Sequence, residues 1–174
     1  MHLICTDEST AVEVTVTPGQ AGGAPQFDGL FAAARARVPD ADEVVADKGY
    51  DSWAIKDTVL EADMAAHIPS KSNAAEPWPI DEAAYKDRNR VERLVNKIKQ
   101  FRAAATRYDK LAATFLATLK LVLALIKIRS IVNRTWHSGS TFPLPDVVHP
   151  IFVTDRYRPQ VNAGVAGHFG FGHE

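Results

Sequence analysis

The sequence predicts an α/β fold, because short apolar segments with strand-like composition alternate with segments of helical periodicity. Strand-like composition recurs in four short segments: residues 2–6, 12–17, 43–46 and 66–69. Apolar residues recur at helical spacing over residues 27–38, and again from residue 81 onward. With 174 residues, 46% of them hydrophobic, the chain is long enough to bury a core of its own.

The first half of the chain places an acidic residue at the end of a strand. The turn-forming residues 7–9 join the first two strands into a hairpin, and residues 27–38 form a helix. The buried strand at residues 43–46 leads directly into Asp47. We therefore expect the Asp47 carboxylate to lie where that strand ends.

The second half of the chain is mainly helical. Asp81 opens a long helical pattern with an apolar stripe: Val91, Leu94, Val95, Ile98 and Phe101. A break at Tyr108 and Asp109 precedes a second helix, from residue 111 to about residue 131. This helix is almost wholly apolar, but three cations interrupt it: Lys120, Lys127 and Arg129. The pattern favours a buried core helix over a membrane span.

The C-terminal stretch differs from the rest of the chain. Residues 132–174 contain several prolines, a glycine-rich end and no sustained period. We expect them to form a poorly ordered tail behind a single domain at residues 1–131. Cys5 is the only cysteine and the N-terminus does not resemble a secretory signal, which predicts a cytoplasmic protein.

Charge is zoned along the sequence, although the formal net charge is only -1. Residues 1–85 carry 5 basic and 15 acidic residues, whereas residues 86–134 carry 13 basic and 3 acidic residues. A basic zone on helical sequence is the footprint expected for contact with a phosphate backbone. A solvated basic helix face explains the charge alone equally well.

Four polar residues share one face of the helix that begins at Asp81, within about 60° of arc: Tyr85, Arg88, Glu92 and Lys99. A carboxylate would repel DNA by itself, but among groups that contact phosphate it can hold a divalent cation against a phosphodiester. The alternative is that Glu92 only forms an ion pair with Arg88 one helical turn away, worth a few tenths of a kcal/mol.

These four residues have the spacing Y-x2-R-x3-E-x6-K, and three other stretches accompany them: TPGQ at residues 17–20, ADKGYD at residues 46–51 and RNRVERLVNKIKQFRAAATRYDK at residues 88–110. Together they closely resemble bacterial insertion-sequence transposases of the DDE class, over roughly residues 1–131. Only 44 residues separate Asp47 from Glu92, too few for the large strand-rich insertion of some relatives. The resemblance is therefore to a compact type.

The resemblance implies a ribonuclease-H-like core in which three acids bind two Mg²⁺ ions, with Mn²⁺ able to substitute. These metals serve phosphodiester cleavage and strand transfer at transposon ends. Asp47 matches the second acid of the family and Glu92 the last, so both are expected to be catalytic and metal-binding. Tyr85, Arg88 and Lys99 match residues that hold the transposon end, chiefly through phosphates. The implied partners are double-stranded DNA, both terminal repeats and target, and a second subunit in the intact enzyme.

Neighbouring residues have simpler interpretations. Without the family, Asp47 is equally well explained as a turn acid that stabilises the following helix. We expect Gly49 to adopt a positive φ that aims the acid. Either Asp51 or Ser52 can cap the following helix, and we expect Asp51 to be a cap rather than a metal ligand. Three cations lie on another helix face, where we favour solvation over contact with flanking DNA: Arg90, Arg93 and Lys97.

The chain also departs from the family. The first acid of the family lies on the first strand, upstream of a segment resembling HLICTD (residues 2–7), and we expect it to be missing here. Asp7 falls in a turn and is no substitute. The family's strands follow the spatial order 3-2-1-4-5, so the missing strand is the central one. The hairpin would then have no partner joining it to the later strands, and the strand edges must be exposed, covered or bridged directly.

We therefore expect an N-terminally truncated transposase core with long C-terminal helices, inactive alone. It would be either the second of two reading frames joined by frameshifting, with the upstream product as a partner, or a decayed fragment. One alternative is a non-catalytic DNA-binding or regulatory fragment derived from a transposase. Another is a helical structural domain with a solvated basic face. The expected location is the bacterial cytosol, associated with the nucleoid and not with a membrane.

Overall fold

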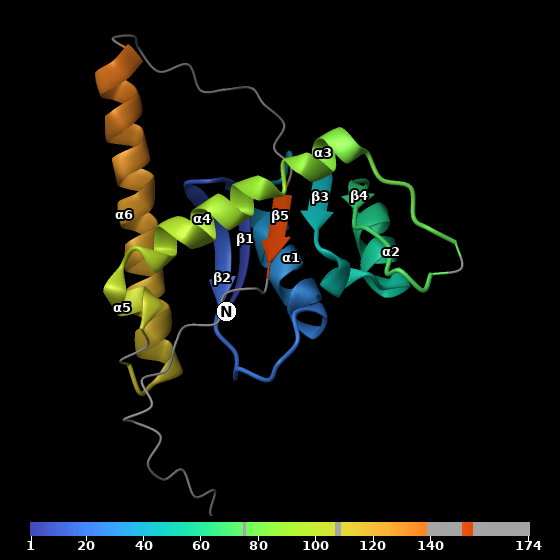
Figure 1. The fold of residues 1–174 in the computed structure, drawn as a ribbon, viewed down its shortest axis with the longest axis horizontal. Coiled ribbons are helices and arrows are strands. Elements are labelled where there is room, and N and C mark those ends of the chain that lie inside the picture. The colour runs from blue at the N-terminus through green and yellow to red at the C-terminus, as the bar shows by residue number, and fades with distance from the viewer. Residues whose placement is uncertain (75, 107–108, 139–150, 155–174) are drawn as a thin grey trace, which may run out of the picture.

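One mixed sheet organises the fold. The structure is a computed structural model that describes residues 1–74, 76–106, 109–138 and 151–154. In these residues five strands follow the order β2-β1-β5-β3-β4 (Figure 1). The strands are β1 (His2–Asp7), β2 (Thr10–Thr15), β3 (Glu43–Ala46), β4 (Ala65–His67) and β5 (Ile151–Thr154). The α-helices are α1 (Phe27–Arg37), α2 (Trp53–Glu61), α3 (Glu82–Lys86), α4 (Asn89–Lys99), α5 (Arg102–Ala105) and α6 (Ala112–Ser138), with short 3-10 turns η1 (Ala24–Gln26) and η2 (Lys48–Tyr50). The predicted α/β class is confirmed.

The first two strands form the predicted antiparallel hairpin, from His2 opposite Thr15 to Asp7 opposite Thr10. In its turn the Asp7 carboxylate accepts hydrogen bonds from the Ser9 amide at 2.6 Å, the Ser9 hydroxyl at 2.7 Å and the Thr10 hydroxyl at 2.6 Å. Burial disfavours the charge of Asp7, but these hydrogen bonds outweigh it and lower the pKa of the carboxyl below its usual value. Asp7 is the turn residue that the sequence predicts.

β5 lies at the centre of the sheet and joins its two halves. It runs antiparallel to β1, with Leu3 opposite Thr154, and parallel to β3, with Ala46 opposite Val153. Residues 151–153 are buried, and they are apolar in succession because a central strand has no solvent-facing side. The hairpin therefore reaches β3 and β4 through a strand from the C-terminal region.

The expectation of a poorly ordered tail from residue 132 is wrong for two stretches. α6 continues to Ser138, and residues 151–154 form β5. The gap predicted at the centre of the sheet is filled, so the facing edges of β1 and β3 are paired rather than exposed or bridged directly. The sequence did not reveal β5 because a strand of four residues, three of them apolar, is too short to show a period. Residues 139–150 and 155–174 lie outside the described residues.

Helices cover both faces of the sheet. α4 crosses the near face in Figure 1, while α1 lies behind the sheet. Alternate strand residues point to opposite faces: Leu3, Cys5 and Phe152 pack in a core with residues of α4 and α6, whereas Ile4 and Val153 pack with residues of α1 and α2. β1 and β5 thus contribute to two separate cores, one on each face.

The long helical pattern that begins at Asp81 is divided into pieces. The Asp81 carboxylate caps α3 by accepting a hydrogen bond from the Ala83 amide at 2.7 Å. α3 ends at Lys86, and α4 begins at Asn89 with Arg88 at its N-cap. The sequence predicted one continuous helix here, because the short junction keeps the helical spacing of the apolar stripe.

α6 is not the fully buried helix that its composition predicts. Its inner face joins the core through Phe115, Leu119, Val122, Leu123 and Ile126. Its outer face exposes large apolar residues: Leu121, Leu125, Ile128 and Val132. Within the described part of the chain, no helix is long and apolar enough to cross a membrane.

The central position of β5 can be tested by truncating Phe152, which is fully buried. We expect Phe152→Ala to lower the free energy of unfolding by about 3–5 kcal/mol, because it leaves a cavity in the core between the sheet and helices α4 and α6. Urea unfolding followed by circular dichroism measures this change. Val132→Ala, at a residue that is 57% exposed, is the control and should change stability by less than about 0.5 kcal/mol. Equal stability of the wild type and Phe152→Ala would contradict the placement of β5.

Candidate active site and DNA-binding face

Asp47 lies at the carboxyl end of β3, as predicted. It is buried, and it is the N-cap of η2, where its Oδ1 accepts a hydrogen bond from the Gly49 amide at 2.8 Å. β3 runs parallel to β4 and β5, so the carboxyl ends of these three strands share one edge of the sheet. Ligand sites of α/β proteins form at such edges. The position therefore suits a functional acid, although the turn-stabilising alternative is also present.

Gly49 serves Asp47 in a different way from the one predicted. Its backbone does not adopt the positive φ that the sequence suggested. A residue without a Cβ suits this position because the Asp47 carboxylate approaches the Gly49 Cα closely. A Cβ atom built on Gly49 would lie 2.8 Å from Asp47 Oδ1, closer than real Cβ contacts allow. Glycine thus lets the carboxylate fold back onto its own turn.

This close approach predicts the effect of adding one methyl group. Gly49→Ala should lower the free energy of unfolding by about 1–3 kcal/mol, because the carboxylate must move and lose its hydrogen bond. Gly29→Ala is the matched control, since a Cβ there meets nothing within 4 Å and lies in α1, where alanine is favoured by about 0.5–1 kcal/mol. Urea unfolding should show a lower free energy of unfolding for Gly49→Ala and a higher one for Gly29→Ala. An unchanged free energy of unfolding for Gly49→Ala would contradict the close contact with Asp47.

Asp51 does not cap a helix through its side chain, so that prediction is wrong. The N-cap of α2 is Ser52, which makes no side-chain cap hydrogen bond. The Asp51 carboxylate instead pairs with Lys56 at 2.6 Å and accepts a hydrogen bond from the Lys71 amide at 2.7 Å. The contact with Lys56 outweighs burial and holds the pKa of Asp51 below its usual value. Asp51 ties η2 to α2 and to the segment after β4.

Three of the four residues on the predicted helix face are in contact. The Arg88 guanidinium lies over the Tyr85 ring, 5.6 Å from its centroid, and Arg88 Nη2 lies 2.8 Å from Glu92 Oε1. The ion pair between Arg88 and Glu92, which is the alternative to a metal site at Glu92, is therefore present. Arg88 has five N–H donors, so this pair leaves it able to donate to a phosphate as well.

Lys99 is the last residue of α4 and is exposed. It lies 11 residues beyond Arg88, which is about three helical turns or about 16 Å along the same face. Because the spacing of phosphates along one DNA strand is shorter than this, Arg88 and Lys99 suit two separate phosphates rather than one.

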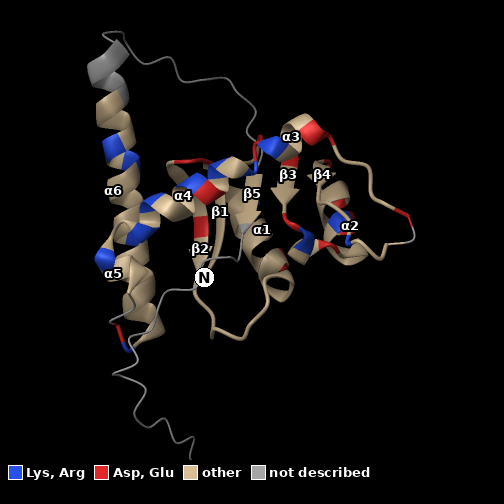
Figure 2. Ribbon diagram, viewed as in Figure 1, with Lys and Arg blue, Asp and Glu red and all other residues tan. Residues whose placement is uncertain are grey.

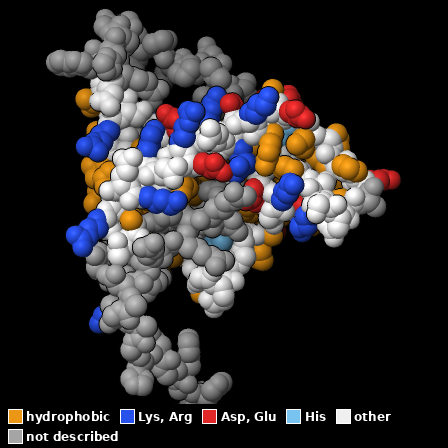
Figure 3. All heavy atoms as spheres, viewed as in Figure 1, with side chains coloured by type: hydrophobic (Ala, Val, Ile, Leu, Met, Phe, Trp, Pro, Cys, Tyr) orange, Lys and Arg blue, Asp and Glu red, His pale blue; other side chains and the backbone are white. Residues whose placement is uncertain are grey.

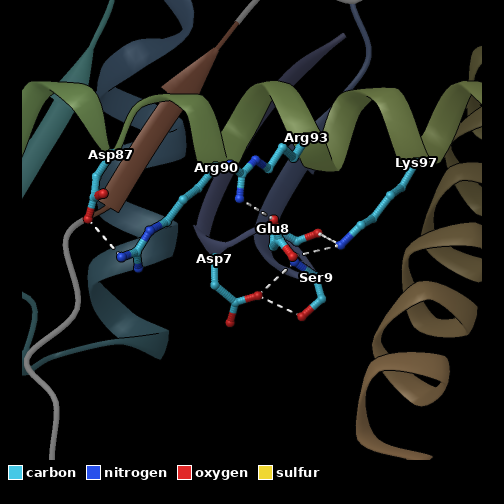
Figure 4. A network of polar contacts seen from close by, with 7 residues as sticks. All are labelled: Asp7, Glu8, Ser9, Asp87, Arg90, Arg93 and Lys97. Atoms are coloured by element: carbon cyan, nitrogen blue, oxygen red, sulfur yellow. Dashed lines mark hydrogen bonds and ion pairs between the residues drawn. The ribbon is translucent and has the colours of Figure 1, made fainter. Parts of the chain in front are cut away.

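The other basic residues of α4 are engaged by the protein itself (Figure 4). Arg93 Nη1 lies 3.2 Å from Glu8 Oε2, Lys97 Nζ lies 3.3 Å from Glu8 Oε1, and Lys97 also donates to the Glu8 carbonyl at 3.0 Å. Arg90 pairs with Asp87 at 2.7 Å. Hydrogen bonding from Arg93 chiefly lowers the pKa of Glu8. These cations remain partly exposed, as expected, but they also have acidic partners: the hairpin turn brings Glu8 to Arg93 and Lys97 from far away in the sequence, and Asp87 is the local partner of Arg90.

Lys and Arg positions recur along α4 and α6 in the ribbon view (Figure 2). On the surface their side chains spread over the same part of the molecule, with acidic side chains among them (Figure 3). The basic residues that cluster in the sequence between residues 86 and 134 therefore also lie together on this face of the molecule. Glu8 and Asp87 neutralise part of it, and Glu92 pairs with Arg88 in the same way, whereas Lys99 is exposed at the end of α4.

The carboxylates fit a divalent metal only in part. Oxygen ligands of Asp and Glu are those that Mg²⁺ prefers, and Asp47 and Glu92 both supply them. However, in the described ranges no three His, Cys, Asp or Glu side chains gather closely enough to hold a metal ion. The structure therefore does not form a complete three-acid site from its described residues.

Comparisons with known proteins agree with the resemblance found in the sequence. Residues 44–129 match the family described as transposase DDE domain. The chain is also 26% identical, over 131 residues, to a Brucella ovis protein named as a transposase for insertion sequence element IS6501; the match covers 74% of this chain and 97% of that protein. No solved structure matches the chain. Residues 44–129 therefore belong to the DDE domain family of transposases, a class that acts on DNA and generally uses divalent metal ions.

Proposed function

We propose that this chain takes part in insertion-sequence transposition by holding transposon-end DNA on the face formed by Tyr85, Arg88 and Lys99. The observation that carries the proposal is the contact of Arg88 with both Tyr85 and Glu92 at the start of α4, in a chain whose residues 44–129 belong to the DDE domain family of transposases. A guanidinium held in place by a ring and a carboxylate is preorganised to bind a phosphate. Its work on DNA would take place in the bacterial cytosol, at the nucleoid.

We further propose that the sheet is a ribonuclease-H-like core in which β5 stands where the first strand of that core belongs. The order β2-β1-β5-β3-β4 supports this, because it becomes 3-2-1-4-5 when β5 takes the place of the first strand. On this proposal the first strand of the family, with its acid, is not among the described strands.

Asp47 and Glu92 would be the catalytic acids that this chain contributes, as ligands for Mg²⁺ or Mn²⁺. Their oxygen chemistry supports this role. The described residues lack a group of three ligands, so the chain is expected to be incomplete for catalysis and to need an upstream product for cleavage and strand transfer. In the intact enzyme a second subunit would hold the second transposon end.

A second candidate is a non-catalytic DNA-binding or regulatory protein derived from a transposase. The lack of a three-ligand group among the described residues favours it equally. Both candidates use the same DNA-binding face. They differ in whether cleavage appears once an upstream product is supplied.

The DNA-binding face can be tested by removing two of its cations. Arg88→Ala combined with Lys99→Ala should weaken binding to a duplex that carries the element end. It should also lower the slope of log K against log salt by about two, because two phosphate contacts disappear. Fluorescence anisotropy over a range of salt concentrations measures both quantities.

The matched control is Arg93→Ala combined with Lys97→Ala. It removes the same two residue types from the same stretch of chain, but both of these cations pair with Glu8, whereas of the tested pair Arg88 pairs with Glu92 and Lys99 is exposed. We expect a clearly smaller change in the salt slope. Equal slopes for the wild type and Arg88→Ala/Lys99→Ala would show that the assigned face is wrong.

Catalytic incompleteness predicts no cleavage of end-bearing DNA by the chain alone with Mg²⁺ or Mn²⁺, measured on denaturing gels. Adding the upstream product should produce cleavage that Asp47→Asn or Glu92→Gln abolishes, because each removes a ligand charge. Cleavage by the isolated chain would disprove incompleteness. Failure of the upstream product to produce cleavage would favour the non-catalytic candidate.

A further inference from the structure

Two tryptophans and a lysine form a cluster on the segments that follow β3 and β4. Trp53, the first residue of α2, meets Trp78 edge to face, with ring centroids 5.6 Å apart and an interplanar angle of 83°. The Lys56 ammonium lies 5.5 Å from the centroid of the Trp53 ring and 5.0 Å from that of Trp78. We call Trp53, Lys56 and Trp78 the tryptophan cluster.

The tryptophan cluster is held firmly by its surroundings. The Trp78 indole donates to the Ala66 carbonyl at 2.8 Å, and its amide donates to the Ser70 hydroxyl at 2.8 Å. Lys56 is buried and pairs with Asp51 at 2.6 Å. Trp78 and Lys56 thus give the Trp53 ring a firm support to pack against, and such support reduces the entropy that binding would cost.

Trp53 is nevertheless 65% exposed. An indole that served only to support Lys56 would gain more by burial, since aromatic side chains contribute mainly through the area they remove from water. Most of its surface is instead available to a planar ligand. Ordinary exposed apolar residues such as Leu60 on the same helix, 47% exposed, lack both the plane and the rigid mounting.

The location and the nearby charges indicate which ligand fits. The cluster follows β3 and β4, whose parallel carboxyl ends lie at the edge of the sheet that carries Asp47. Two exposed lysines lie beside Asp51, the partner of Lys56: the Asp51 amide donates to the Lys48 carbonyl at 3.3 Å, and Lys71 Nζ donates to the Asp51 carbonyl at 3.4 Å. A flat aromatic surface beside ammonium groups suits a nucleobase with its phosphates.

We propose that Trp53 stacks on an unpaired nucleobase of DNA, close to the strand end that carries Asp47. The inference rests on the proposed function, because it assumes that the chain holds DNA. Stacking tolerates any base, since every base has a π face. The tryptophan cluster thus binds a single-stranded segment, whereas the Arg88–Lys99 face binds duplex phosphates.

The experiment compares a blunt duplex with the same duplex carrying a short single-stranded dT tail, both bound to the full chain. The tail should increase the affinity of the wild type. Trp53→Ala should lose about 5- to 150-fold of that gain, while its affinity for the blunt duplex and its salt slope stay unchanged. Trp53→Phe keeps an aromatic plane and should retain most of the gain. Leu60→Ala is the matched control and should bind like the wild type.

Each outcome decides between the two proposals. If Trp53→Ala keeps the full gain from the tail, the stacking inference is wrong, whatever happens at the duplex face. If the wild type binds dT strands in a Trp53-dependent way but ignores blunt duplex, stacking stands and the duplex face fails. If the wild type binds neither DNA, both are wrong. Thermal melting of Trp53→Ala near that of the wild type shows that the loss is not due to unfolding.

Discussion

The pairing of β5 between β1 and β3 is the interaction on which the rest of the structure depends. Without it, the hairpin and the β3–β4 pair would each present an open edge of backbone N–H and C=O groups, which is costly when buried and prone to aggregation when exposed. With it, one continuous sheet supports α1 and α2 on one side and α4 and α6 on the other. The carboxyl end of β3, where Asp47 lies, gains its lateral support from the same pairing.

Local patterns made most of the fold predictable. The hairpin, the helix at Phe27–Arg37 and the strand at Glu43–Ala46 all follow from periodicity and turn chemistry over a few residues. β5 could not be predicted in this way, because a strand of four residues is too short to show an alternating pattern. It is recognised only by its pairing with the distant strands β1 and β3. The same holds for Glu8, whose contact with Arg93 joins residues far apart in the sequence.

The candidate site was predictable where helical geometry alone decides. Arg88 lies about one helical turn from Tyr85 and one from Glu92, and the short junction between α3 and α4 keeps that spacing, so Arg88 contacts both. Residue spacing alone does not show which other groups compete for a side chain. The Asp51 carboxylate pairs with Lys56 of α2 at 2.6 Å instead of capping a helix. The tryptophan cluster was missed for the same reason, since Trp53 and Trp78 meet only through the fold.

The place of β5 in the chain also bears on how the protein is made. A ribosome releases residues in order, at roughly 5–20 residues per second, so β1 to β4 emerge well before the strand that joins them. Until residues 151–154 appear, the two halves of the sheet cannot close, and contacts of such long sequence separation form slowly. The nascent chain therefore passes through a period in which its strand edges are open to other proteins, and chaperones would be most needed then.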